Sequence, residues 1–306
     1  MLRAIAIGLA VVALVHGAIY HWRMTRARRA DDARLAPGAD GIIPGAQPIS
    51  LQASTTHAAL LLHGFGDTPQ TVRALAGNLH AVHGWTVRAP LLPGHGRSLA
   101  DFDACGAAEW RAAVHREYIA LKTEYETVVL VGLSMGSALA TLEAAQDPTL
   151  PALVLLAPYL TPPASAQRLV PLAGVINLLI PYLAGGDRER SIFDPTARAL
   201  ALGYGGTPPK RIRDLVSVAH DARFAAANVR APTLLMHSRS DYRIPVPLAM
   251  SHPELFPAAS VCEQQWVSGC GHVITVDYCR EQVWAATAAW LARFAGAPAP
   301  VAGRLS

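Results

Sequence analysis

Cysteine is scarce in this sequence, with only 4 residues among 306. The four positions are Cys105, Cys262, Cys270 and Cys279, and their spacing matches no metal-binding template, so the sequence predicts no metal site. We expect free thiols as the default state. If the body of the protein were exported, Cys270 and Cys279 would be the first pair to consider for a disulfide.

Surplus charge is also lacking over most of the chain. The formal net charge is +4, and residues 1–35 hold all of it, because they contain six arginines and two aspartates. The remainder is formally neutral. A protein that binds nucleic acid needs a basic face to neutralise phosphates, so this distribution argues against a nucleic-acid partner.

Internal repeats and low-complexity tracts are absent from the sequence as well. Hydrophobic residues make up 52% of the chain, which is typical of a globular protein with a substantial core. This composition excludes a disordered chain.

A long apolar run lies near the N-terminus, with the sequence "AIAIGLAVVALVHGAIYHW" over residues 4–22. Its length approaches what a helix needs to span a bilayer, and Tyr20 and Trp22 stand where an interfacial aromatic belt would fall. A cleaved signal peptide is the alternative, with Val15 and Gly17 as small residues before the cut, although the run is longer than a usual signal core. We favour an uncleaved membrane anchor.

Arginines around this run predict its orientation. Five of them follow the run within about a dozen residues, whereas only Arg3 and the terminal amine precede it. Because cytoplasmic flanks are enriched in positive charge, the sequence predicts a body on the cytoplasmic side. Cleavage of a signal peptide would instead predict an exported body.

Strand and helix patterns alternate along the body. Short apolar runs typical of buried strands occur at 47–51, 57–62, 84–90, 127–131, 150–158, 231–241 and 260–272. Helical patterns follow at 69–83, at 107–125 and from Ser134 to about Ala145. Such alternation predicts an α/β fold with a mostly parallel sheet and helices on both faces.

Residues 159–229 interrupt the alternation, since no convincing strand occurs there. The segment contains a proline-punctuated apolar stretch over residues 169–186, and we expect it to form a helical lid over the carboxyl ends of the strands, where such sheets bind ligands. Leu179 and Leu183 are its candidate substrate contacts. The predicted division of the chain is an anchor (1–35), a first core part (36–158), a lid (159–229) and a second core part (230–306).

The stretch "VVLVGLSMGSALAT" (residues 128–141) places Ser134 between Gly132 and Gly136, where a strand becomes a helix. A serine on so tight a turn has a strained backbone and crowded neighbours, and flanking glycines relieve that crowding. The pattern matches the G-x-S-x-G nucleophile elbow. An ordinary turn with a serine helix cap is the alternative interpretation.

A serine nucleophile needs an imidazole base, and the base needs a carboxylate to hold its tautomer. In elbow enzymes these groups follow the serine in the order acid and then histidine, each after a later strand. Asp241 in "HSRSDYRIP" and His272 in "SGCGHVITVD" satisfy both conditions. Ser134, Asp241 and His272 are therefore the candidate catalytic residues.

Two backbone N–H groups are also needed to stabilise the oxyanion formed during acyl transfer. One candidate is the amide of Met135, which directly follows the nucleophile. The other is the amide of Phe65 in the segment "HGFG" after the strand at 57–62.

Five segments together resemble the alpha/beta-hydrolase superfamily, and within it the bacterial carboxylesterase and monoacylglycerol-lipase-like branch. They are "LLLHGFGDTPQ", "PLLPGHGRS", "VGLSMGSA", "HSRSDYRIP" and "GCGHVITVD", spanning about residues 45–295. The resemblance implies a serine hydrolase of carboxylic esters with no cofactor. Cys270 departs from the usual pattern, since a small Ser or Gly is common there.

The leading hypothesis is a membrane-anchored esterase acting on short- or medium-chain acyl esters, monoacylglycerol or lysophospholipid. Thioester, amide or carbon–carbon bond hydrolysis on the same residues stays open. A membrane-tethered binding protein with an inactive hydrolase body is the alternative of a different class.

Overall fold

A seven-stranded sheet forms the centre of the computed structural model, which describes residues 2–298. Its order is β1-β3-β2-β4-β5-β8-β9, and every neighbouring pair is parallel except β1 and β3. The strands are β1 (Ile49–Leu51), β2 (His57–Leu62), β3 (Thr86–Ala89), β4 (Thr127–Leu133), β5 (Leu153–Leu156), β8 (Thr233–Ser238) and β9 (Cys262–Val267). The predicted α/β class with a mostly parallel sheet is confirmed.

Alternate residues of the central strands β2, β4, β5 and β8 point into two separate cores, one on each face of the sheet. In β2, Leu60 and Leu62 belong to one core, whereas Ala59 and Leu61 belong to the other. All of these side chains are fully buried. Because helices cover both faces, these central strands are mostly apolar runs rather than alternating ones.

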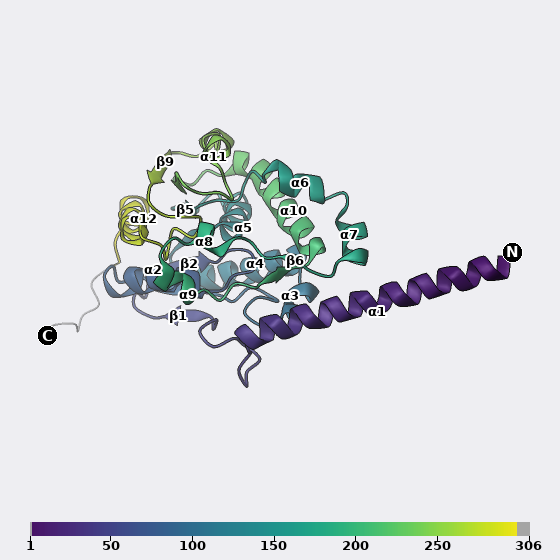
Figure 1. Cartoon of the computed structure of the whole chain (residues 1–306). Helices are drawn as coiled ribbons and strands as arrows, with labels where there is room; N and C mark the ends of the chain where they lie inside the picture. The colour runs from purple at the N-terminus through teal and green to yellow at the C-terminus, as the bar shows by residue number, and fades with distance from the viewer. Residues whose placement is uncertain (1, 299–306) are drawn as a thin grey trace.

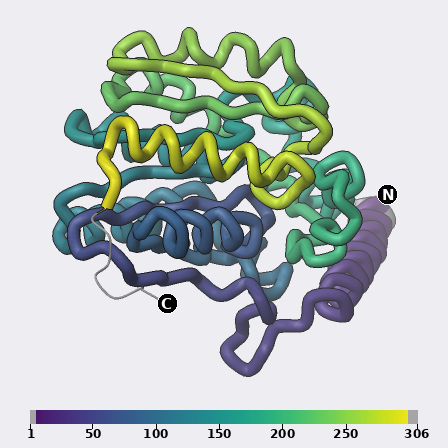
Figure 2. Tube along the Cα trace, turned by 90° about the vertical axis from the view of Figure 1, so that its left-hand side faces the viewer, coloured from purple at the N-terminus to yellow at the C-terminus, as the bar shows by residue number. Residues whose placement is uncertain are grey.

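Helices lie on both faces, as Figures 1 and 2 show. In Figure 2, α2 (Gln70–Ala81) and α12 (Arg280–Ala295) lie side by side on the face toward the viewer. The core on the opposite face includes residues of α4 (Ala107–Glu124), α5 (Met135–Ala144) and α10 (Pro209–Ala225). Shorter helices are α3 (Leu99–Ala104), α11 (Val246–Ala249), η1 (Ala226–Asn228) and η2 (Pro253–Leu255).

A mainly helical insertion connects β5 to β8. Before α10 it contains α6 (Ala164–Leu169), α7 (Ala173–Leu179), β6 (Leu183–Ala184), α8 (Arg188–Ser191), α9 (Pro195–Ala199) and β7 (Gly206–Thr207). The expectation that this segment holds no strand is wrong, because β6 and β7 pair antiparallel. Each strand has only two residues and glycine stands at the pairing, so no period-2 pattern marks them in the sequence.

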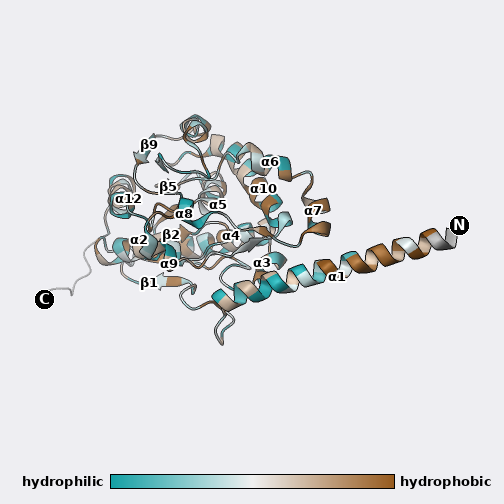
Figure 3. Cartoon of the chain, in the orientation of Figure 1, coloured by the Kyte–Doolittle hydropathy of each residue, from teal (hydrophilic) through white to brown (hydrophobic). Residues whose placement is uncertain are grey.

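Helix α1 (Leu2–Arg34) projects from the body as a long rod, and its outer half is apolar (Figures 1 and 3). It continues past the apolar run as far as Arg34, and its end is fixed to the insertion. Asp31 is buried and accepts the Gly205 N–H at 2.8 Å, and Arg34 donates to the Gly203 carbonyl at 2.6 Å. Arg28 donates to the Tyr182 hydroxyl at 2.8 Å.

The expectation of free thiols is wrong for two of the four cysteines. Cys270 and Cys279 form a disulfide, whereas Cys105 and Cys262 are free. The course of the loop between β9 and α12 brings the two cysteines together, because the loop turns back on itself and they lie near its two ends.

Candidate active site

Ser134 occupies the sharp turn between β4 and α5. Its φ angle is +55°, a left-handed value that strains a residue with a side chain. A Cβ atom on Gly132 would lie 2.4 Å from the Gly136 carbonyl oxygen, and one on Gly136 would lie 2.2 Å from the Leu62 carbonyl oxygen. Both neighbours must therefore be glycine, which is the reason the sequence pattern suggested.

The structure brings the three candidate catalytic residues together from three loops at one edge of the sheet. His272 Nε2 lies 2.8 Å from Ser134 Oγ, and His272 Nδ1 lies 2.6 Å from Asp241 Oδ2. Ser134 is 9% exposed, whereas Asp241 and His272 are each 4% exposed. A hydroxyl, an imidazole and a carboxylate in this chain can transfer a proton away from the hydroxyl.

Asp241 lies in a setting that keeps its carboxylate ionised. Burial by itself would raise its pKa, but the adjacent His272 and two backbone N–H groups hold the pKa below its ordinary value. The N–H groups are those of Arg243, at 2.7 Å, and Ile244, at 3.0 Å. A charged Asp241 accepts the Nδ1–H of His272, which leaves Nε2 free to accept the Ser134 proton.

The two candidate oxyanion donors lie beside Ser134. Met135 is the first residue of α5, so its N–H has no acceptor within the helix. The loop that carries Phe65 passes close to the serine, because a Cβ atom on Gly64 would lie 3.5 Å from Ser134 Cβ. The Phe65 ring packs against Phe102 and Trp110 and so fixes this loop.

A cavity of about 430 Å³ opens next to Ser134 and His272. Its apolar lining comes from the core and from the insertion, and includes Leu133, Ile192, Ala184, Ile212, Leu215 and Val273. Leu179 and Leu183, the expected substrate contacts, do not line it. Leu179 is 52% exposed, because α7 lies at the outer edge of the insertion.

Charged side chains also line this cavity, which sequence reasoning missed. They are Asp67, Arg188 and Arg243. Burial raises the pKa of Asp67 to about 7, although a hydrogen bond from the Thr68 N–H and the charges of the two arginines partly offset this effect. Nothing in the local sequence marks the arginines, since they come from the insertion and from the loop after β8.

No group of three or more His, Cys, Asp or Glu side chains within residues 2–298 is arranged to hold a metal ion.

Four buried histidines surround the site and resist protonation. Burial lowers the pKa of His63 to about 4, of His237 to about 3 and of His252 to about 4, and it also lowers the pKa of His95. Between these values and 6.5, the unfolded chain binds protons that the folded chain does not, so acidification lowers stability. Asp67 acts in the opposite sense between pH 3.8 and about 7, and so does Glu143, whose pKa is also raised by burial, but these are two groups against four.

We therefore expect the free energy of unfolding to fall as the pH is lowered from 6.5 toward 4. Each net proton contributes about 1.4 kcal/mol per pH unit. Urea denaturation at several pH values measures the slope. His252→Gln should reduce it, whereas replacement of the exposed His220 by Gln should leave it unchanged. A slope of zero or of the opposite sign would contradict the conclusion that the buried histidines control the pH dependence of stability.

A model of the family described as Serine aminopeptidase, S33, matches residues 53–278 of the chain. The chain belongs to this family. This S33 member is 27% identical over 264 residues to the thermostable monoacylglycerol lipase of Bacillus sp. (strain H-257), an alignment that covers 83% of the chain and 98% of the lipase.

Solved structures agree with this placement of the S33 member. One reported for the metagenome-derived lipolytic enzymes LipS and LipT has a TM-score of 0.72 and 27% identity, over 82% of this chain and 99% of that one. The monoacylglycerol lipase of Paleococcus ferrophilus has a TM-score of 0.70 and 22% identity, over 80% and 98%, and shows the shared fold. The protein is thus an α/β-hydrolase that cleaves carboxylic esters.

Proposed function

We propose that Ser134, His272 and Asp241 form the catalytic triad of this esterase. The observation that carries the proposal is the continuous chain of contacts from Ser134 Oγ through His272 to Asp241, at 2.8 Å and 2.6 Å. Ser134 attacks the ester carbonyl while His272 Nε2 takes its proton and then delivers it to the leaving alcohol. Water, activated by the same imidazole, hydrolyses the acyl-enzyme.

The amides of Phe65 and Met135 are the proposed donors to the oxyanion in both steps. Met135 directly follows Ser134 and Phe65 lies in the loop that passes beside it, and backbone donors require no side chain to move. Fixed donors of this kind stabilise the tetrahedral intermediate more than the planar ester.

We infer that the substrate is a lipid-like acyl ester with a short or medium chain, of the monoacylglycerol or lysophospholipid type. The partly apolar cavity beside Ser134 supports this substrate class, as do the lipases among the relatives. Thioester, amide and carbon–carbon bond cleavage are the alternatives that the same triad chemistry permits.

A series of p-nitrophenyl esters of increasing acyl length tests the proposal. We expect kcat/KM to rise by up to about fourfold per methylene, since burying one CH₂ contributes about 0.8 kcal/mol, until the cavity is full. Ile212→Asp should flatten the series because it places a charge in the lining, and Ile212→Ala serves as the size-only control. A flat series in the wild-type protein would contradict an acyl-binding cavity.

We propose further that α1 crosses a membrane and that α7 lies in the membrane interface beside it. α1 is long and apolar enough to span a bilayer: its most apolar 18-residue window has a mean hydropathy of 1.8, and none of that window is buried in the body. Four side chains of the α7 region are more than half exposed: Leu172, Val175, Leu178 and Leu179. Figure 3 shows the apolar colour shared by α7 and the outer half of α1.

One contact sets the depth of α7. His16 Nε2 of α1 lies 2.8 Å from the Leu178 carbonyl oxygen. His16 precedes Trp22 by six residues, which is about 9 Å along a helix. If Trp22 marks the membrane–water interface, α7 enters the membrane to about the depth at which interfacial amphipathic helices lie.

Leu179→Asp is therefore expected to lower hydrolysis of a monoacylglycerol in vesicles about tenfold, while hydrolysis of a soluble ester stays nearly unchanged. Val82→Asp is the matched control, because Val82 is 68% exposed at the end of α2 and distant from α1. Deleting residues 1–30 should likewise lower hydrolysis of the vesicle substrate. The soluble ester should still be hydrolysed, because the contacts of Asp31 and Arg34 with the insertion are kept. Equal vesicle rates for the two Asp variants would show that α7 does not touch the bilayer.

The side of the membrane follows from the cysteines in our proposal. Two of the five arginines that predict a cytoplasmic body, Arg28 and Arg34, have partners in the insertion. These two arginines thus have a structural role, apart from any role in setting the orientation of α1 in the membrane. Disulfides persist in oxidising compartments and are rare in the cytosol. Because Cys270 and Cys279 are paired, we propose a body outside the cytoplasm that α1 tethers to the membrane.

A further inference from the structure

The loop between β9 and α12, residues 268–279, carries His272 and is called the His272 loop below. It contains no strand or helix, so no ladder of backbone hydrogen bonds fixes the imidazole. Proton transfer nevertheless needs Nε2 and Nδ1 to stay within hydrogen-bond distance of Ser134 and Asp241 at the same time. Other contacts must hold the loop in place.

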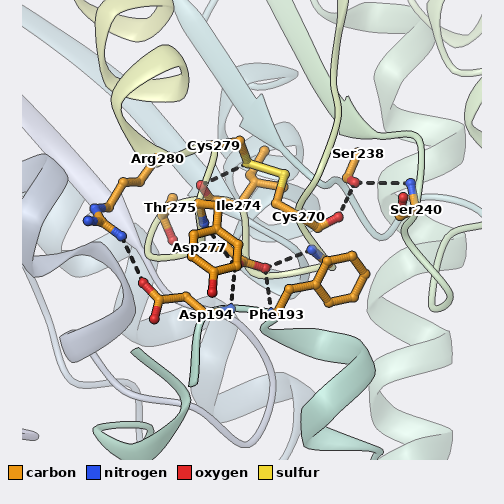
Figure 4. The surroundings of a disulfide bond; sticks show 12 residues. Phe193, Asp194, Ser238, Ser240, Cys270, Ile274, Thr275, Asp277, Cys279 and Arg280 are labelled. Atoms are coloured by element: carbon orange, nitrogen blue, oxygen red, sulfur yellow. Dashed lines mark hydrogen bonds and ion pairs between the residues drawn. A yellow bond between two sulfur atoms is a disulfide. The ribbon is translucent and has the colours of Figure 1, made fainter. Parts of the chain in front are cut away.

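The first of these contacts is the disulfide. It joins Cys270, two residues before His272, to Cys279 at the end of the loop (Figure 4), and thus closes a covalent ring of backbone that includes His272. Cys270 is fully buried and Cys279 is 7% exposed. Ser238, the last residue of β8, donates to the Cys270 carbonyl, which ties the start of the loop to the sheet.

The second contact is Asp277, whose carboxylate is fully buried and has no cationic side chain within 4 Å in the described part of the chain. Its oxygens accept four backbone N–H groups instead (Figure 4). Oδ2 accepts those of Gly271, at 2.7 Å, and Phe193, at 2.8 Å, while Oδ1 accepts those of Asp194 and Tyr278, each at 2.8 Å. A buried carboxylate is costly unless it is fully hydrogen-bonded, and here every contact is with backbone.

These contacts act on the immediate neighbours of His272. The N–H of Gly271 donates to Asp277, and the N–H of Val273 donates to the Ser191 carbonyl at 3.0 Å. A Cβ atom on Gly271 would lie 2.6 Å from the Ser191 carbonyl oxygen, so the loop also packs tightly on the insertion. The residues on both sides of His272 are therefore fixed, although the imidazole itself makes none of these bonds.

We propose that the Cys270–Cys279 disulfide and the Asp277 carboxylate position His272 for proton transfer, so that full esterase activity requires the oxidised protein. The proposal rests on the triad proposed above. Cys270, Cys279 and Asp277 are positioning residues, since none of them contacts the reacting atoms. A disulfide or carboxylate that served stability alone would lower the unfolding temperature without changing the turnover of folded protein.

The experiment uses the full-length protein in detergent, oxidised or treated with dithiothreitol. A dithiothreitol thiolate attacks the disulfide, its second thiol closes a cyclic disulfide, and two electrons and two protons pass to the cysteines. Because the native disulfide is buried, the variant Cys270→Ala/Cys279→Ala supplies the open loop independently of access by the reductant. Titration with a fluorophosphonate counts the reactive sites, so that kcat refers to folded, reactive protein.

We expect the reduced protein and the Cys270→Ala/Cys279→Ala variant to lose about tenfold to a hundredfold in kcat with KM within about twofold, since misplacement by about 1 Å has effects of this size. Asp277→Asn should do the same, because an amide nitrogen cannot accept the N–H groups that one carboxylate oxygen now accepts. Cys105→Ala/Cys262→Ala is the matched control: it should keep full activity and remain sensitive to dithiothreitol. Oxidised glutathione should restore the reduced wild-type protein and the reduced Cys105→Ala/Cys262→Ala control, but it should not restore Cys270→Ala/Cys279→Ala.

Unchanged kcat after reduction and in Cys270→Ala/Cys279→Ala, with only a lower unfolding temperature, would overturn the proposal. Failure of the triad itself gives a different result, namely an oxidised Ser134→Ala protein that still hydrolyses the ester. In that case the downfield NMR resonance of the His272 Nδ1–H proton still reports whether His272 is held beside Asp241. The resonance is assigned by its loss in His272→Gln. It should be sharp in the oxidised protein and broadened on reduction.

Discussion

Ser134→Ala is expected to lower kcat for ester hydrolysis by about 10⁴-fold or more, which is the general behaviour when a triad nucleophile is removed. The reason is chemical, because the hydroxyl contacts His272 Nε2 at 2.8 Å and contributes little to the core. Alanine keeps the Cβ atom, so the strained turn and its flanking glycines are unchanged. The fold should therefore stay intact.

Steady-state hydrolysis of a p-nitrophenyl ester, together with labelling by a fluorophosphonate, measures this effect. The variant should give neither turnover nor label, while its circular dichroism spectrum matches the wild type. Ser260→Ala, an exposed serine in the loop before β9, is the control and should be fully active. Retention of more than about a tenth of the wild-type activity would mean that another residue is the nucleophile.

Asp241→Asn should cost on the order of 10⁴-fold in kcat, because the amide favours the wrong imidazole tautomer. The wild-type carboxylate accepts the Nδ1–H of His272 at 2.6 Å. An asparagine that presents its NH₂ group there would force the proton onto Nε2, and Nε2 could then no longer accept the Ser134 proton.

The comparison with Asp277→Asn makes this prediction specific. Both aspartates are buried and both lie near the His272 loop, but Asp277 contacts backbone N–H groups and not the imidazole. We expect a loss for Asp277→Asn that is at least tenfold smaller than for Asp241→Asn. Asp221→Asn, in an exposed ion pair with Arg111, should be neutral. The reverse order of the first two variants would reassign the catalytic acid to Asp277.

The proposed oxidation requirement and the proposed location support each other. A body outside the cytoplasm can keep Cys270 and Cys279 paired, and in our proposal this pairing holds His272 in place. The same protein held in a reducing compartment would fold around a looser His272 loop. Such a difference would lower lipid hydrolysis by about tenfold to a hundredfold until the protein reaches its membrane location.

The chemistry of the site could be predicted from the sequence because each part is local. Gly132, Ser134 and Gly136 belong to one turn, and their spacing follows from contacts between neighbouring residues. Asp241 and His272 could be found because parallel strands bring their carboxyl ends to one edge of the sheet, so order along the chain determines proximity. Apolar runs likewise predict the strands of the central sheet.

Other features depend on contacts between distant segments, and only the tertiary structure decided them. Helix α1 extends to Arg34 because Asp31 meets Gly205, which lies 174 residues away. Leu179 faces outward although its sequence suggested a pocket wall. Asp277 binds the N–H groups of Phe193 and Asp194, and Cys270 pairs with Cys279, because the His272 loop folds back on the insertion. Short-range patterns determine which chemical groups are present and which elements form, whereas burial and pairing across the chain determine which of those groups meet.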